Sequence, residues 1–247
     1  MGVPIDVGGR LVSFAFFAAC LWPISMMCRS LRLPRTAIVV AGTLLFASPI
    51  YVYWSRTVMI ESCALFFSAF WLALLVRVLE RPNLTNVAAT TLAGTLGVLA
   101  KSTSFAAFGL LGGALLLWNL AGLLRAGGRP EFLRTILIGL CVCGIPLLIG
   151  VGWVAYSDSV KSANELGARL TSASLSAWNL GTLAQRTSAQ LWEQTIFDRT
   201  LKDTFGTAWF AAVPVAAIGF LNSRTRVWTA AAVTGFLAPF LLFTNLH

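Results

Sequence analysis

Two ionisable residues stand at the ends of strongly apolar segments of this chain. Glu61 lies where one apolar run begins, and Lys101 lies where another ends. Because a charged side chain at membrane depth is costly, such residues tend to mark a functional site. A carboxylate and an ammonium group gathered on one face of a helix bundle predict chemistry on a charged, lipid-linked substrate.

Arg56 precedes Glu61 and follows an aromatic cluster that is typical of a membrane interface. One interpretation is an ion pair between Arg56 and Glu61 that fixes a helix junction, although their spacing is less favourable than four residues. The other is a carboxylate that binds a metal ion or an acceptor, beside an arginine that binds phosphate. The sequence leaves both interpretations open.

Lys101 begins a polar stretch, residues 101–104, where only a tight turn between two apolar runs is possible. A lysine that snorkels from a helix end is one interpretation. The other is a cation for a lipid-linked phosphate, with the hydroxyl groups of Ser102 and Thr103 as further donors. These alternatives also remain open.

The composition indicates a polytopic membrane protein. Of the 247 residues, 57% are hydrophobic and 11% are charged, with a mean hydropathy of +0.81, whereas a soluble domain has roughly 25% charged residues. The net charge of +9 does not predict a nucleic-acid partner, because the basic residues separate apolar runs and form no patch. The five cysteines lie within apolar runs, as small buried hydrophobic residues do, and the single histidine, His247, excludes a histidine-based metal cluster within the chain.

The apolar runs predict an all-α transmembrane helix bundle of about eight spans, since a crossing helix needs roughly 20 apolar residues. Glycines near the predicted turn at Lys101 are expected to let helices approach closely. The predicted spans are 11–28, 36–53, 57–78, 85–100, 104–124, 134–156, 207–221 and 227–244.

The arginines predict the orientation of this bundle. The gaps after the first, third, fifth and seventh spans are rich in arginine, so they are expected to face the cytoplasm. Arg56, Glu61 and Lys101 would then lie on the outer side, and a bacterial inner membrane is the expected location.

This predicted topology divides the chain into three parts. Residues 1–156 form an N-terminal transmembrane bundle of about six spans. Residues 157–206 form an outer, periplasmic loop with short amphipathic helices, and residues 207–247 form a C-terminal transmembrane pair.

The chain resembles the integral-membrane glycosyltransferases of the GT-C class. The resemblance rests on residues 9–13 (Gly-Arg-Leu-Val-Ser), Ser48-Pro49, Arg56 with Glu61, and residues 94–101 (Gly-Thr-Leu-Gly-Val-Leu-Ala-Lys). Their order, spacing and topology are most similar to the protein-mannosyltransferase and aminoarabinose-transferase branch, glycosyltransferase family 39. The resemblance covers most of residues 9–125 and is weaker afterwards.

The resemblance implies transfer of a sugar from a polyprenyl-phosphate carrier to a lipid, glycan or protein acceptor on the outer side of the membrane. It implies that Glu61 is a catalytic residue near the acceptor and any divalent metal ion, which is the only cofactor implied. Lys101 would bind the carrier phosphate. Arg56 matches the arginine before the acid and would be a second substrate-binding residue that offsets the charge on the leaving phosphate. His247 resembles the start of a later outer segment and is a further substrate-binding candidate.

The chain departs from this family at its principal catalytic acid. That acid belongs to a first outer loop, which would precede Gly9, and Asp6 is the only upstream acid and lacks the expected context. A fragment truncated at both ends is therefore expected. Two other functions remain open, a transporter for a small anionic solute and a non-catalytic membrane fragment. A transporter would need polar residues in the middle of several spans, and these spans are poor in them.

Overall fold

The computed structural model describes residues 4–176, 180–202, 206–222, 225–226, 229–230 and 232–233. The described residues form helices joined by turns, without a β-strand among them, so the expected all-α fold is confirmed for this part of the chain. The chain divides into two compact units, Met1–Gly150 and Val151–His247, which are described separately.

Four helical segments are long and apolar enough to cross a membrane: Ile5–Ser30, Glu61–Glu80, Leu84–Arg125 and Arg129–Ser162. Two shorter apolar helical segments are Arg35–Ala47 and Gly206–Leu221. These segments indicate a membrane protein, while the total of about eight spans stays a prediction.

The first unit begins with two pairs of helices, α1 (Ile5–Ala19) with α2 (Leu21–Ser30), and α3 (Arg35–Ala47) with α4 (Pro49–Ser55). The predicted span 36–53 is interrupted at Ser48, whose φ of −69° and ψ of 118° are extended. A residue before proline is disfavoured in the helical region, and proline suits the first position of a helix. A new helix therefore starts at Pro49.

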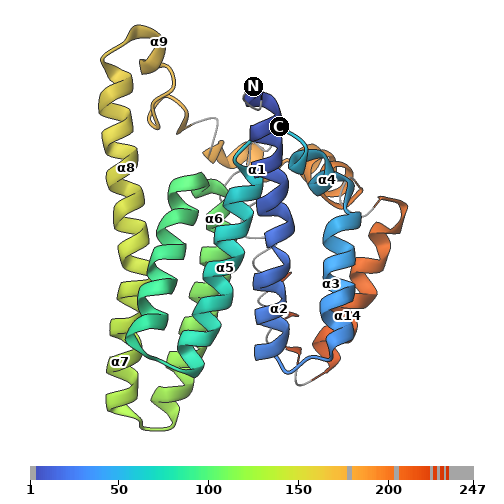
Figure 1. Cartoon of the computed structure of the whole chain (residues 1–247), viewed down its shortest axis with the longest axis vertical. Helices are drawn as coiled ribbons and strands as arrows, with labels where there is room; N and C mark the ends of the chain where they lie inside the picture. The colour runs from blue at the N-terminus through green and yellow to red at the C-terminus, as the bar shows by residue number, and fades with distance from the viewer. Residues whose placement is uncertain are drawn as a thin grey trace. The chain divides into compact units, whose positions relative to one another are not determined.

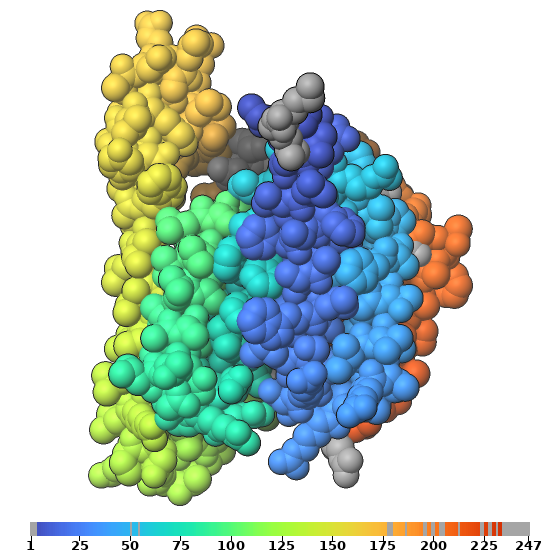
Figure 2. Space-filling view, viewed as in Figure 1, coloured from blue at the N-terminus to red at the C-terminus, as the bar shows by residue number. Residues whose placement is uncertain are grey.

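Helix α5 (Glu61–Glu80) forms the centre of the first unit. Its Trp71, Leu72, Leu75 and Val78 are almost fully buried. It packs against α1 and α2 on one side and against α6 (Leu84–Arg125) on the other (Figure 1). In the space-filling view, side chains of the blue α1–α2 segment meet those of the turquoise α5 segment (Figure 2). A helix that is apolar on all faces is buried in this way.

Helix α6 folds back on itself at Lys101, whose φ of −162° and ψ of 99° are not helical (Figure 1). A methyl group at Gly94 would lie 2.6 Å from Trp71 Cδ1, and one at Gly112 would lie 2.4 Å from Trp71 Cη2. In a straight helix these two glycines would be about 27 Å apart, too far to contact one indole ring. The two arms of α6 therefore pack side by side against α5, and they correspond to the predicted runs 85–100 and 104–124.

The segment after α6 contains α7 (Arg129–Gly139), the π-helical turn η1 (Leu140–Gly144) and α8 (Ile145–Ser162). Pro146 has no N–H group, so one carbonyl a turn earlier lacks its usual helical donor. Trp71 Nε1 donates to the Val142 carbonyl at 3.0 Å, and Thr91 Oγ1 donates to the Cys141 carbonyl at 3.2 Å. The π-helical turn thus exposes two carbonyls to donors from α5 and α6.

The second unit contains short helices in the region predicted as a loop. They are α9 (Glu165–Ala168), α11 (Leu183–Arg186), α12 (Ala189–Leu191) and η2 (Trp192–Lys202). The side chain of Asn164 accepts hydrogen bonds from the first turn of α9, and Thr182 forms a capping box with Gln185. These polar caps define the short helices, whereas the outer location of residues 157–206 stays a prediction.

The last described elements are η3 (Gly206–Ala211) and α14 (Ala212–Leu221). They correspond to the predicted span 207–221. The predicted span 227–244 lies mostly outside the described residues, and so do Asn245 and His247.

Candidate functional site

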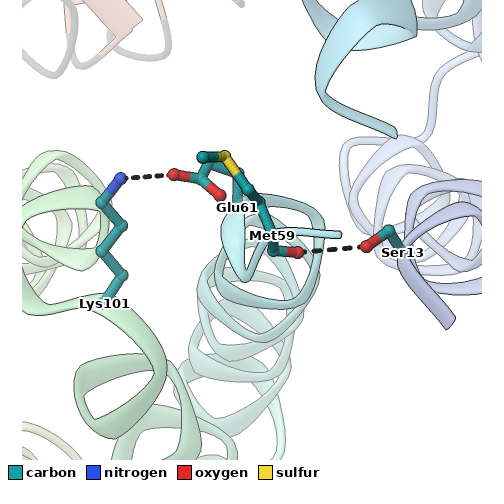
Figure 3. Close-up of polar contacts among 4 residues, drawn as sticks. All are labelled: Ser13, Met59, Glu61 and Lys101. Carbon is teal, nitrogen blue, oxygen red and sulfur yellow. Dashed lines mark hydrogen bonds and ion pairs between the residues drawn. The ribbon is translucent and has the colours of Figure 1, made fainter. Parts of the chain in front are cut away.

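Glu61 and Lys101 form an ion pair. Lys101 Nζ donates to Glu61 Oε1 at 2.8 Å (Figure 3). The Glu61 side chain is 27% exposed and that of Lys101 is 37% exposed, so the pair is only partly buried. The structure therefore brings together two charged residues, Glu61 and Lys101, that stand at the ends of separate apolar runs in the sequence.

Glu61 is the first residue of α5, not a residue one turn inside a span that begins at 57. Residues 56–60 are not helical, and Met59 N donates to the Thr57 carbonyl at 3.0 Å within this turn. A carboxylate in the first turn of a helix interacts favourably with the helix dipole and its free N–H groups. This position places the Glu61 side chain beside the N–H groups at the start of α5.

The turn 56–60 is held against α1 by two contacts. Ser13 Oγ, on a residue that is 4% exposed, donates to the Met59 carbonyl at 3.1 Å (Figure 3). A methyl group at Gly9 would lie only 2.5 Å from Val58 Cγ1, so the close approach of α1 to the turn requires glycine. Residues 9–13, which contributed to the family resemblance, thus position the start of α5.

The second carboxylate oxygen of Glu61 is buried and has no hydrogen-bond partner among the described residues. A buried acceptor without a donor is uncommon in proteins and costs free energy. If the carboxylate turned to expose this oxygen, it could accept a hydrogen bond from a substrate hydroxyl or ligate a cation. The ammonium of Lys101 has three donor hydrogens, so it could bind an anion while it contacts Glu61.

Arg56 faces a different feature, an open cavity of about 660 Å³. Neither Glu61 nor Lys101 lines this cavity. Among the described ion pairs, Glu61 is joined to Lys101 and not to Arg56, so the Arg56–Glu61 junction is not formed. The lining residues are Arg10, Pro49, Val52, Tyr53, Arg56, Thr57 and Val58.

The described residues contain no group of three or more His, Cys, Asp or Glu side chains that could hold a metal ion. Glu61 contributes a single carboxylate, so a divalent ion there would need ligands from a substrate or from elsewhere. His247, a further predicted substrate-binding residue, lies outside the described residues. We therefore assign no chemical step to a metal ion.

Arg10 and Ser13 received no functional role from the sequence. Both lie far from Arg56 and Glu61 in the chain, and only the packing of α1 against the turn 56–60 brings them to the site. The glycine at position 9 was the available signal, because a residue without a side chain permits such a close approach.

Comparisons of the chain with family models, curated proteins and solved structures find no significant match.

Proposed function

We propose that this chain acts as a membrane glycosyltransferase that moves a sugar from a polyprenyl-phosphate carrier to a lipid, glycan or protein acceptor on the outer side of the membrane. The observation that supports this proposal is the Lys101–Glu61 pair. It is partly buried, it lies at the break of α6, and it leaves one carboxylate oxygen of Glu61 without a partner among the described residues.

The proposed reaction breaks the bond between the sugar C1 atom and a phosphate oxygen, and it forms a bond from C1 to the acceptor oxygen. Negative charge grows on the leaving phosphate. The Lys101 ammonium, which contacts Glu61 at 2.8 Å, would stabilise that charge by electrostatic attraction.

Glu61 has a separate role in this proposal. Its free oxygen would accept a hydrogen bond from the acceptor hydroxyl and so hold the nucleophile beside the phosphate that Lys101 binds. The family resemblance assigns removal of the acceptor proton to an acid in a first outer loop that would precede Gly9. The proton would pass to that acid of the longer protein, so Glu61 orients the hydroxyl and need not be the base.

The exposed surface of the bundle suits a carrier with a long apolar tail. Many large apolar side chains on α1, α3 and α6 are exposed, including Leu11, Val39, Leu92 and Leu117. In a bilayer these side chains face lipid, and a polyprenyl chain could lie among them while its phosphate reaches the charged pair.

A transporter for a small anionic solute is the second candidate. The observation in its favour is the interruption of α6 at a charged residue, because transporters often bind ions where a membrane helix is broken. Such breaks lie near the middle of the membrane, whereas Lys101 pairs with the first residue of α5.

The test uses the whole protein in proteoliposomes with polyprenyl-phosphate carrying a radiolabelled hexose or pentose, and native membranes as the acceptor source. We expect release of polyprenyl phosphate, and we expect Lys101→Met to slow it about 100-fold or more. Arg125→Gln is the matched control, because Arg125 is exposed at the far end of α6. If Lys101→Met turned over at the normal rate, the role of Lys101 would be wrong. Uptake of a labelled anion without carrier release would support the transporter.

A further inference from the structure

The cavity between α1 and the end of α4 contains two arginines from different parts of the chain. Arg10 comes from α1, and Arg56 comes from the turn after α4. Both side chains are exposed, and no carboxylate is among the residues that line the cavity. The described ion pairs include neither arginine. Among the described residues, the lining therefore has two positive charges and no negative one.

This arrangement suits an anion with several oxygen atoms. Two guanidinium groups that face one cavity repel each other, and an anion between them removes this cost. Guanidinium groups bind phosphate through paired, charge-assisted hydrogen bonds. Thr57 adds a hydroxyl group to the lining. Phosphate is therefore the anion that the polar side of the cavity fits.

Apart from the aromatic side chain of Tyr53, the remaining described lining is aliphatic, and it continues onto an exposed apolar surface of α1. Pro49, Val52 and Val58 line the cavity. Beside Arg10 on α1, Leu11 is 60% exposed and Val12 is 56% exposed, and α1 belongs to a segment long enough to cross a membrane. A ligand here would have a phosphate group in the cavity and apolar chains beside it.

We propose that the Arg10–Arg56 cavity binds the phosphate group of an anionic membrane phospholipid. The site is separate from the Lys101–Glu61 pair, because neither of those residues lines the cavity. The inference concerns binding alone and does not depend on sugar transfer. A bound lipid at this position would brace α1 against the turn that precedes Glu61, which Ser13 and Gly9 already hold together.

The test is native mass spectrometry of the whole protein after exchange into detergent micelles that contain phosphatidylglycerol or phosphatidylcholine. We expect one phosphatidylglycerol to remain bound with at least about tenfold preference over phosphatidylcholine. In Arg10→Gln/Arg56→Gln this preference should disappear, since each arginine contributes a charge-assisted hydrogen bond that corresponds to about tenfold in affinity. Arg125→Gln, which removes one exposed arginine far from the cavity, should bind like the unchanged protein.

Three further results decide the proposal. Arg10→Lys/Arg56→Lys keeps both charges but loses the paired hydrogen bonds, and we expect intermediate affinity in a folded protein. Equal lipid binding by the unchanged protein and Arg10→Gln/Arg56→Gln would overturn the site. Complete displacement of the lipid by millimolar inorganic phosphate would show a free-anion site and would overturn the lipid assignment. Lipid binding is measured without a sugar donor, so it tests this inference whether or not the unchanged protein transfers sugar.

Discussion

The carboxylate of Glu61 and the ammonium of Lys101 differ in how firmly they are held. Glu61 is fixed at the first position of α5, and the turn before it is bonded to α1 through Ser13 and Met59 (Figure 3). Lys101 reaches the carboxylate on a flexible four-carbon stem from a non-helical residue. A fixed acceptor and a movable cation suit a site where an incoming phosphate competes for the ammonium.

Changing Lys101 and changing Glu61 should lower the stability of the protein by different amounts. We expect Lys101→Met to lower the free energy of unfolding by about 1–3 kcal/mol, because it leaves a partly buried carboxylate without a donor. Glu61→Gln should cost less, about 1 kcal/mol, since its amide oxygen still accepts a hydrogen bond from Lys101. Unfolding by sodium dodecyl sulfate, followed by circular dichroism, measures both changes.

The combined substitution Glu61→Gln/Lys101→Met tests whether the two side chains interact. Because they share one contact, the loss in the double variant should be smaller than the sum of the two single losses. Strictly additive losses would mean that the pair does not form in the membrane protein.

The residue types and spacing predicted part of this site. A charged residue at each of two helix ends is visible in the sequence, and the turn at Lys101 follows from the polar stretch 101–104. The contact between Glu61 and Lys101 was not visible, because it depends on how far α6 folds back beside α5. Arg10 was missed for the same reason, since its place in the cavity depends on the packing of α1 against the turn 56–60.

At the scale of elements, one tryptophan joins three helical segments. Trp71 is 1% exposed; it contacts Gly94 and Gly112 on the two arms of α6, and it donates to Val142 in η1. Small residues at these two positions let the arms approach an indole ring, as in other membrane helix pairs. The packing of the hairpin therefore depends on which glycines face Trp71.

Two adjacent glycines in α6 provide a matched test of this packing. A methyl group at Gly112 would lie 2.4 Å from Trp71 Cη2, whereas a methyl group at Gly113 would have no atom within 4 Å. We expect Gly112→Ala to destabilise the protein by about 1–3 kcal/mol through overpacking. Gly113→Ala should be neutral or stabilising by up to about 1 kcal/mol, since alanine favours the helix. Apparent melting temperatures in detergent compare the two variants, and equal values would contradict the hairpin packing.

The π-helical turn η1 provides a second matched pair. Thr91 Oγ1 on α6 donates to the Cys141 carbonyl of η1 at 3.2 Å. Thr95 Oγ1 instead donates to the Thr91 carbonyl within α6 itself, at 2.9 Å. Thr91→Val should therefore cost about 0.6–1.5 kcal/mol, and Thr95→Val less, because a bond to a carbonyl already used by the helix adds little. Hydrogen exchange of the amides in 140–145 should increase only in Thr91→Val. If both variants exchanged alike, the bond to Cys141 would not hold the turn.

Local chemistry and packing explain the element boundaries that the predicted spans missed. The break at Ser48 follows from Pro49, and the π-helical turn follows from Pro146, yet both prolines lie inside apolar runs that hydropathy alone treats as continuous. The start of α5 at Glu61 instead of 57 depends on tertiary contacts with α1, which no local pattern reports. Composition and periodicity thus predicted the helices, and proline chemistry and packing decided where they end.

At the scale of the whole molecule, the arginine pattern and the fold of α6 together predict which side of the membrane each part of α6 faces. The arginine-rich gaps at 77–81 and 125–134 lie at the far ends of the two α6 arms, and Lys101 lies at the turn between them. If both arms cross the bilayer, the arginine-rich ends share one side and the Lys101–Glu61 pair faces the other. A single tilted helix would instead place the two ends of α6 on opposite sides.

Labelling of single cysteines with a membrane-impermeant maleimide distinguishes these topologies. In a background in which the five native cysteines are replaced by alanine or serine, Thr85→Cys, Ser102→Cys and Ala126→Cys place exposed thiols at the start, the turn and the end of α6. We expect Ser102→Cys to react in intact cells, and Thr85→Cys and Ala126→Cys to react only after the membrane is opened, because the positive-inside rule places the arginine-rich ends in the cytoplasm. Reaction of Thr85→Cys and Ala126→Cys from opposite sides would contradict the hairpin. Reaction of all three with the sides exchanged would retain the hairpin but move the Lys101–Glu61 pair to the cytoplasmic side, where a transferase that acts on the outer side could not use it.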